Sequence, residues 1–419
     1  MKNNILKKLS NALLIIGPGI FAIGYTIGTG SVTSMLVAGS TYGMELLWVL
    51  LVSCYFSGVL IYVFGNYALK TGETALFAFK KHLKWGKAIG ILIILGIVIG
   101  QWNSLIGIVG ITSNIFFEIF LIYFPGLEGY EYITVLLIAA FIVSLFYYFL
   151  LKGTYLFFEK VLIIFVSIMG LSFILSLLLV YPLPSDVIRG LIPSIPEVEG
   201  GSMMVAAFVG TTMAAATFLS RPLFIKGKGW TEKDLYVQKR DAISAAILIF
   251  IISGSIMAVA CGALFYNGEP ITHVSDMPTA LEPIAGKFAM TIFFFGTISA
   301  GLSSIFPILL IVPLLVADYR SGELDTTSKQ FKVITGLASI IGLTIPVFGA
   351  NPINGQILSQ VFNVFVLPLV IIGIIIVING TAYRAIHKTK GWINGSLVAA
   401  LIFSLVISYN GVKAIIAYF

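Results

Sequence analysis

The stretch Ile23–Ser31, read as IGYTIGTGS, interrupts a long apolar run near the start of the chain. It contains three glycines and four hydroxyl-bearing residues, although the surrounding run, residues 13–38, is long enough to cross a bilayer. Irregular backbone at membrane depth is tolerated only where it is buried in protein or lines a watery cavity, because lipid offers no hydrogen bonds. The stretch therefore predicts a helix that is broken inside the membrane to form a site.

The composition of the whole chain places this stretch in a membrane protein. Of 419 residues, 58% are hydrophobic and 10% are charged, whereas about 25% of residues are charged in soluble proteins. Apolar runs of about 20 residues predict an all-α polytopic protein with eleven transmembrane helices. We expect these spans at residues 13–38, 43–68, 88–119, 132–151, 156–181, 202–224, 242–266, 287–316, 331–349, 354–379 and 393–417. The expected location is a cell membrane of the bacterial inner-membrane type, with the lipid bilayer as a partner.

The charged loops predict the orientation of the chain. The formal net charge is +7, and the basic residues gather in alternate loops, for example at Lys84, Lys152 and Arg240. Cytoplasmic loops carry an excess of lysine and arginine, so we expect the N-terminus inside and the C-terminus outside. The basic balance is thereby explained without a nucleic-acid partner, and a monomer is expected to suffice for transport.

A second interrupted span matches the first. Val209–Thr217, read as VGTTMAAAT, places glycine and threonines in the middle of span six. Because spans one and six are five helices apart, we predict two inverted five-helix repeats at about 11–182 and 200–380, followed by an extra helix at about 392–417. Paired broken helices in inverted repeats form substrate sites at the bilayer midplane of secondary transporters. Alternating-access transport is therefore the leading hypothesis.

Several segments resemble the Nramp family of divalent metal transporters over nearly the whole chain. The resemblance implies the inverted-repeat architecture of LeuT-type (APC) transporters, with broken helices 1 and 6. The segments are Gly17–Phe21 (GPGIF), Val37–Leu50 (VAGSTYGMELLWVL), Ala300–Ser304 (AGLSS), Ile357–Asn363 (ILSQVFN) and Leu367–Pro368.

The metal-binding motifs of that family are missing. The family's Asp-Pro-Gly-Asn motif falls on Gly28–Ser31 (GTGS), and its Met-Pro-His motif falls on Ala214–Ala216 (AAA). Divalent cations usually require oxygen, nitrogen or sulfur ligands that include a carboxylate, and no Asp, Glu or His stands in the middle of a predicted span. The sequence therefore predicts a substrate other than a divalent metal.

The altered site predicts a small anion, such as bicarbonate or a short carboxylate. A half-helix that starts after Gly28 would point free N–H groups and a partial positive charge at its ligand. Further donors are expected from Gln101, Trp102, Asn103, Gln360 and Asn363, and Arg221 is interpreted either as an inner-loop topology signal or as a cation that draws anions inward. The predicted substrate-binding residues are Thr26, Gly28, Thr29, Gly30, Ser31, Gly210, Thr211, Thr212, Ala214 and Thr217.

Span eight predicts a coupling ion. Ala300, Ser303 and Ser304 follow the pattern with which LeuT-like symporters hold sodium against carbonyls of the broken first helix, here that of Gly24. Two hydroxyls with carbonyls suit a monovalent hard cation, so Na⁺ is the expected coupling ion. We expect no other cofactor and no enzyme activity, because the sequence shows no nucleophile with a base, no metal cluster and no phosphate loop.

Three alternatives stay open. One is a divalent metal transporter for manganese, iron or magnesium with an atypical site built from backbone carbonyls, Met35 and Met213. Another is a transporter of small neutral amino acids. The third is a transport-inactive sensor that retains the fold.

Overall fold

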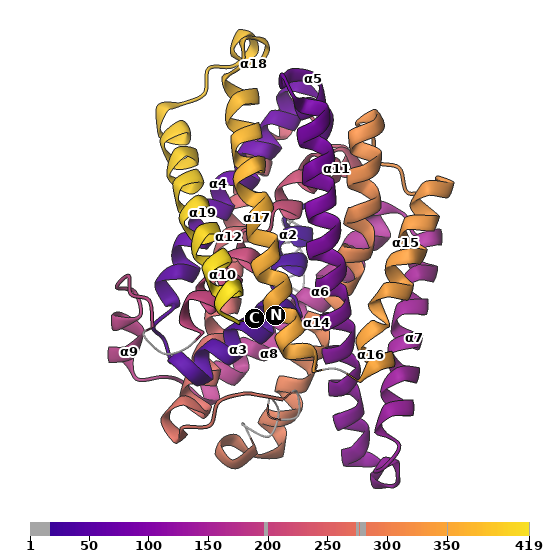
Figure 1. Cartoon of the computed structure of the whole chain (residues 1–419), viewed down its shortest axis with the longest axis vertical. Helices are drawn as coiled ribbons and strands as arrows, with labels where there is room; N and C mark the ends of the chain where they lie inside the picture. The colour runs from indigo at the N-terminus through magenta and orange to yellow at the C-terminus, as the bar shows by residue number, and fades with distance from the viewer. Residues whose placement is uncertain (1–16, 197–199, 274–275, 277–281, 350, 419) are drawn as a thin grey trace, which may run out of the picture.

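The described part of the chain is built from α-helices and short 3-10 turns, without strands (Figure 1). The structure is a computed structural model, and it describes residues 17–196, 200–273, 276, 282–349 and 351–418. The helices are α2 (Gly19–Thr26), α3 (Thr29–Tyr42), α4 (Leu47–Thr71), α5 (Ala75–His82), α6 (Gly86–Tyr123), α7 (Glu131–Lys152), α8 (Tyr155–Leu179), α9 (Pro184–Arg189), α10 (Gly201–Thr212), α11 (Ala215–Lys228), α12 (Leu235–Ala263), α14 (Glu282–Ser321), α15 (Lys329–Gly342), α16 (Thr344–Phe348), α17 (Pro352–Asn379), α18 (Thr381–Ile386) and α19 (Gly391–Tyr418).

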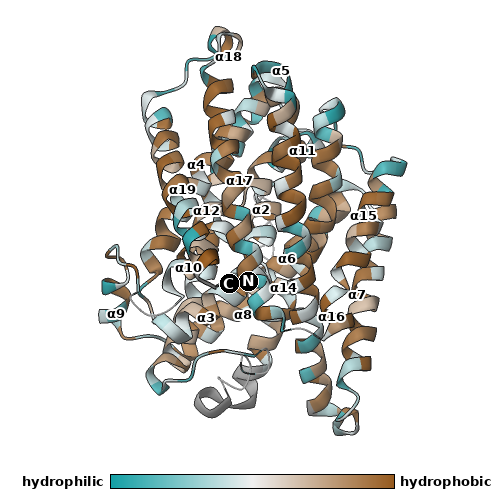
Figure 2. Cartoon of the chain, viewed as in Figure 1, coloured by the Kyte–Doolittle hydropathy of each residue, from teal (hydrophilic) through white to brown (hydrophobic). Residues whose placement is uncertain are grey.

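These helices form the expected set of membrane spans. Within the described residues, ten spans are long and apolar enough to cross a bilayer, and the bent pair α2–α3 makes eleven. Hydrophobic residues cover the middle of the bundle and polar residues gather at its two ends, as Figure 2 shows. The prediction of an all-α polytopic protein is confirmed.

Both predicted breaks are present. The helix axes of α2 and α3 differ by 48°, and Gly28 between them has an extended backbone with φ −63° and ψ −174°. In span six, Met213 and Ala214 separate α10 from α11, and Ala214 is extended with φ −60° and ψ 119°. Each span is therefore two half-helices that meet within the bundle.

The broken helices lie at the centre of the molecule. Every residue of α2 is buried, and this helix contacts α8, α12 and α14. α10 packs against α3 and α17, and almost all of its residues are buried. By contrast, α7 and α19 expose large apolar side chains such as Phe141 and Ile402. The peripheral helices therefore face lipid and shield the two breaks from it.

Candidate functional site

Hydroxyl groups satisfy the carbonyl groups that the breaks release. The Thr211 hydroxyl donates to the Thr26 carbonyl at 3.1 Å and so joins the two broken spans. Ser304 donates to the Gly24 carbonyl at 2.9 Å, and Ser57 donates to the Thr212 carbonyl at 2.6 Å. A helix that ends in the membrane needs such partners, because its last carbonyls have none within the helix.

A buried polar cluster from α6 and α17 faces the first break. Gln101 Nε2 donates to Asn363 Oδ1 at 3.0 Å, and Asn363 Nδ2 donates to Gln360 Oε1 at 3.3 Å. Gln360 Nε2 in turn donates to the Ser104 hydroxyl at 3.1 Å. All four side chains are at most 7% exposed. The cluster places neutral oxygen and nitrogen atoms, and no charge, beside the broken helices.

A small cavity of about 10 Å³ lies between this cluster and the breaks. It is large enough for about one water-sized sphere. Among the residues that the structure describes, no group forms a hydrogen bond with the buried Tyr25 hydroxyl or with Gln101 Oε1. The described residues that line the cavity are Tyr25, Gly30, Gln101, Ser104, Ile108, Thr211, Ala214, Ile308, Gln360 and Asn363, none of which carries a charge.

The backbone donors expected to bind an anion are partly occupied. With its amide oriented to match its neighbours, Gln356 accepts from the Gly30 N–H at 3.3 Å and from Gln360 Nε2 at 2.8 Å.

The Arg221 guanidinium is paired with Asp241, with Nη2 and Oδ2 2.6 Å apart, and both side chains are almost fully buried. Arg221 is therefore not a free cation for drawing anions inward.

The predicted substrate residues divide into two groups. Gly30, Thr211 and Ala214 line the cavity. The other predicted residues are not among the described residues that line it. Gly28 packs against Ser304, and Gly210 packs against the Gln360 carbonyl. The Ser31 hydroxyl lies 3.3 Å from the Ser253 hydroxyl, and the Thr26 carbonyl accepts from Thr211. The Thr212 and Thr217 hydroxyls are buried and have no hydrogen-bond partner within the described part of the chain. Thr29 begins α3, and its side chain lies outside the described residues.

The sequence interpretation named some of the lining residues and missed others. Gln101, Gln360 and Asn363, which were predicted to supply donors to the substrate, line the cavity, whereas Asn103 is exposed and donates to the Ile99 carbonyl. Ser104 could have been found, because it lies three residues after Gln101 and so on the same helix face. No sequence pattern pointed to Tyr25.

Met35 and Met213, the possible sulfur ligands of an atypical metal site, are buried, but neither is among the described residues that line the cavity.

The predicted coupling-ion residues lie together. The Ser303 hydroxyl donates to the Ala300 carbonyl at 2.9 Å, and the Ser304 hydroxyl donates to the Gly24 carbonyl at 2.9 Å. α14 thus brings two hydroxyls and a carbonyl to the end of α2. These four groups supply oxygen atoms only, as a hard monovalent cation prefers.

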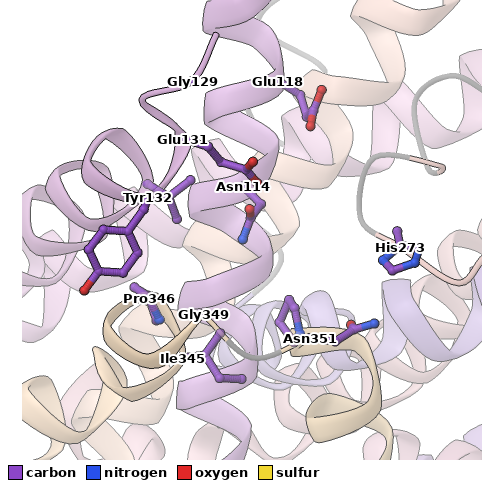
Figure 3. Close-up of a pocket in the computed structure, with 12 residues that line it drawn as sticks. Asn114, Glu118, Gly129, Glu131, Tyr132, His273, Ile345, Pro346, Gly349 and Asn351 are labelled. Carbon is purple, nitrogen blue, oxygen red and sulfur yellow. The ribbon is translucent and has the colours of Figure 1, made fainter. Parts of the chain in front are cut away.

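A wider hollow of about 640 Å³ opens at one end of the bundle, which the charge distribution predicts to be the outer end. Figure 3 shows Asn114, Glu118 and Glu131 on one side of it and His273 and Asn351 on the other. Among the described residues, no group of three or more His, Cys, Asp or Glu side chains is arranged to hold a metal ion. Two carboxylates, Glu118 and Glu131, make the described lining of this hollow acidic.

The architecture and the broken spans agree with comparisons to known proteins. The sequence profile of Nramp, described as natural resistance-associated macrophage protein-like, matches residues 19–413. The chain belongs to the Nramp family. One relative is the divalent metal cation transporter MntH of Vibrio campbellii, which is 24% identical over 413 residues, 96% of this chain and 92% of that protein. MntH of Klebsiella pneumoniae is 23% identical over 431 residues, 95% of this chain and 93% of that protein.

Solved structures confirm the fold of this Nramp-family chain. The Eremococcus coleocola manganese transporter, in complex with an aromatic bis-isothiourea compound, matches with a TM-score of 0.70 and 13% identity, over 96% of this chain and 86% of that chain. MhsT in complex with L-phenylalanine matches with a TM-score of 0.62 and 16% identity, over 96% of this chain and 98% of that chain. The LeuT-type architecture is thereby established, and the chain is a multi-pass membrane protein.

The prediction of a small anion as substrate is wrong. The relatives are named divalent metal cation transporters. The site is consistent with the correction: within the described residues the Gln101 amide oxygen, which can only accept, is without a partner, whereas the reoriented Gln356 amide accepts from the Gly30 N–H. The sequence interpretation gave the missing carboxylate more weight than the neutral oxygen atoms that remain.

Proposed function

We propose that this protein is a secondary transporter that moves a hard divalent metal cation, such as Mg²⁺ or Mn²⁺, by alternating access. The observation that carries the proposal is the cavity between the two broken spans, whose described lining includes residues with neutral hydroxyl or amide oxygens: Tyr25, Gln101, Ser104, Thr211 and Asn363. Amide, hydroxyl and carbonyl oxygens suit magnesium, calcium and manganese rather than soft metals. The names of the relatives support the same class of substrate.

The oxygen ligands that the site offers also determine the affinity that we expect for the cation. Affinity for a divalent cation rises with the number of charged ligands, and oxygen sites of low charge bind at about 0.1–1 mM. The described lining of the cavity contains no carboxylate. We therefore expect half-maximal transport at about 0.1 mM cation or higher.

Purified protein in proteoliposomes provides the test. Mg²⁺ and Mn²⁺ entry is followed with a trapped fluorescent indicator, and we expect saturable uptake above that of empty liposomes. Gln101→Leu removes the buried amide oxygen of a residue that lines the cavity, and it should lower uptake at low cation concentration about tenfold, as for one polar contact to a charged group. Asn103→Leu is the matched control, because Asn103 lies half a turn away and is exposed.

Two results would overturn the proposal. One is uptake of neither cation above empty liposomes at any concentration up to tens of millimolar. The other is saturable uptake that Gln101→Leu and Asn103→Leu leave equally unchanged. The second result would place the transport path elsewhere in the bundle.

For the coupling ion we propose Na⁺ at Gly24, Ala300, Ser303 and Ser304. Support comes from the 2.9 Å contacts that bring the two serine hydroxyls to the Gly24 and Ala300 carbonyls. An inward sodium gradient should accelerate cation uptake, and Ser304→Ala should remove the acceleration. Acceleration by a proton gradient alone would contradict sodium coupling while leaving the substrate proposal intact.

A further inference from the structure

A groove of about 480 Å³ runs along the lipid-facing surface between α4, α12 and α19. α12 and α19 each contact α4, and Figure 1 shows the three helices on the same side of the bundle. The walls of the groove are apolar and include Leu51, Ile243, Ile247 and Phe250. Leu51, Ile243 and Ile247 are each more than 40% exposed. The groove is therefore an open surface feature within the hydrophobic belt.

Two small residues make the floor of the groove. Gly58 of α4 and Ala246 of α12 both line it, and a Cβ added at Gly58 would lie 2.9 Å from the Ala246 Cβ. The two helices therefore approach closely at this point, and neither small side chain takes up space in the groove. An apolar groove of about 480 Å³ suits a flexible hydrocarbon chain.

The end of the groove is polar and basic. Lys239 near the start of α12, Lys390 just before α19 and Trp392 of α19 line this end. Both lysines are exposed, and within the described residues neither forms an ion pair. Trp392 is 55% exposed and stacks on Tyr62 with ring centroids 6.5 Å apart. Tryptophan and tyrosine at the end of apolar spans mark the membrane interface.

We propose that this groove binds an anionic phospholipid. Lys239 and Lys390 would bind the phosphate and its headgroup, Trp392 would lie at the level of the glycerol backbone, and one acyl chain would lie over Ile243, Ile247 and Ala246. The positions of Lys239 and Lys390 favour this ligand, because both lie where the apolar groove reaches the membrane interface. A basic pocket between spans favours anionic headgroups. A zwitterionic lipid would leave the same two charges without a net counter-charge.

Fluorescence quenching of Trp392 tests the proposal in lipid nanodiscs. The discs contain equal amounts of phosphatidylglycerol and phosphatidylcholine, with bromine atoms on the acyl chains of one lipid or the other. The emission of Trp392 is obtained as the difference between the protein and its Trp392→Phe variant. Brominated phosphatidylglycerol should quench this emission more strongly than brominated phosphatidylcholine, which means that the anionic lipid is enriched at Trp392.

Variants separate the headgroup from the chain. Each lysine near an anionic headgroup favours binding about fivefold, so Lys239→Gln with Lys390→Gln should reduce the enrichment by up to about 30-fold. The matched control is Lys84→Gln with Lys87→Gln, which removes two exposed charges from the start of α6, outside the groove. Ala246→Phe should fill the floor and reduce quenching by either lipid.

The opposite results would overturn the proposal. Equal quenching by the two brominated lipids would show that the groove does not select an anionic headgroup. Enrichment that survives Lys239→Gln with Lys390→Gln, or that the control pair removes equally, would attribute the effect to overall charge. Unchanged quenching in Ala246→Phe would exclude an acyl chain from the floor of the groove.

Discussion

Gly28 has room for a hydrogen atom and for nothing larger. A Cβ at this position would overlap the Cβ and hydroxyl of Ser304, which belongs to α14 and donates to the Gly24 carbonyl. The family resemblance places the Asp of the metal motif at Gly28. The missing carboxylate is therefore built into the packing of the broken helix against α14, and it is not an isolated change.

We predict that Gly28→Ala impairs folding or transport and that Ser304→Gly restores part of the loss. Overpacking a filled site costs about 1–3 kcal/mol, and removing the Ser304 side chain creates the needed space. Thermal unfolding in detergent and uptake in proteoliposomes measure the two effects. An unchanged unfolding temperature in Gly28→Ala would contradict the tight contact, and equal damage in the single and double variants would contradict the role of Ser304.

At the scale of elements, the half-helix α2 is fastened at its first turn to α12. Asp241 accepts from the Gly17 and Gly19 N–H groups at 2.8 Å each, and it forms the buried ion pair with Arg221 of α11. Lys228 of α11 lies 2.6 Å from Glu159 of α8. These contacts join four helices on one side of the cavity, so α2 is expected to move only when they open.

We predict that Asp241→Asn loosens α2. The amide cannot pair with Arg221 and leaves a buried charge uncompensated, which costs about 3–5 kcal/mol. Hydrogen exchange followed by mass spectrometry should show faster exchange in residues 20–26. Asp325→Asn is the control, because Asp325 lies in an exposed loop and accepts from Thr327 and Ser328. Exchange in residues 20–26 that stays at the level of the control would contradict the prediction that Asp241 holds α2 in place.

The connection between α4 and α5 contains a second charged cluster, centred on Glu73. Its carboxylate accepts from the Tyr67 hydroxyl at 2.6 Å, and it lies 2.6 Å from Lys81 Nζ and 2.8 Å from His82 Nε2. Burial alone would raise the pKa of Glu73, but hydrogen bonds from Lys81, Tyr67 and His82 outweigh it and lower this pKa to about 2. The folded protein therefore favours the charged form of Glu73.

We predict a loss of stability in acid that Glu73→Gln lacks. Because the pKa of Glu73 is lower in the folded state than its ordinary value of 4.5, the stabilisation is complete above about pH 4.5 and is lost as the pH falls toward 2. The unfolding temperature of the wild type should therefore fall more steeply between pH 5 and pH 3 than that of Glu73→Gln. Glu128→Gln, at an exposed loop position, should behave like the wild type. Parallel curves of unfolding temperature against pH for all three proteins would contradict a stabilising role for the Glu73 cluster.

At the scale of the whole molecule, the alternating charge of the loops predicts the orientation in the membrane. α6 crosses the bundle from Gly86 to Tyr123, so Lys84 and Glu128 lie at opposite ends. In a chain without Cys54 and Cys261, we expect an impermeant maleimide to label Glu128→Cys but not Lys84→Cys in intact cells. Permeabilised cells should label both. The reverse pattern would invert the assignment of the N-terminus to the inside.

The fold was predictable because membrane spans have strong local signals. Apolar runs set the helices, and the glycine and hydroxyl clusters at Gly28 and at Thr211 marked the two breaks, which lie at Gly28 and at Met213–Ala214. The site was only partly predictable: Gln101, Gln360 and Asn363 were named from the sequence, but Tyr25 and Ile308 also line the cavity, and no local pattern indicates that they would. Gln356 shows the limit: its amide reaches the Gly30 N–H across 326 positions, and no local pattern indicates such a contact. The substrate prediction gave the missing carboxylate too much weight, and it also assumed that the Gly30 N–H was free.

The contact between Gly28 and Ser304 also limits how this site could be redesigned. A carboxylate at position 28 needs space that Ser304 occupies, while replacing Ser304 removes the hydroxyl that covers the Gly24 carbonyl. We therefore expect either substitution alone to destabilise the broken helix. A designed carboxylate at position 28 would need a simultaneous change at position 304, together with a new donor for the Gly24 carbonyl.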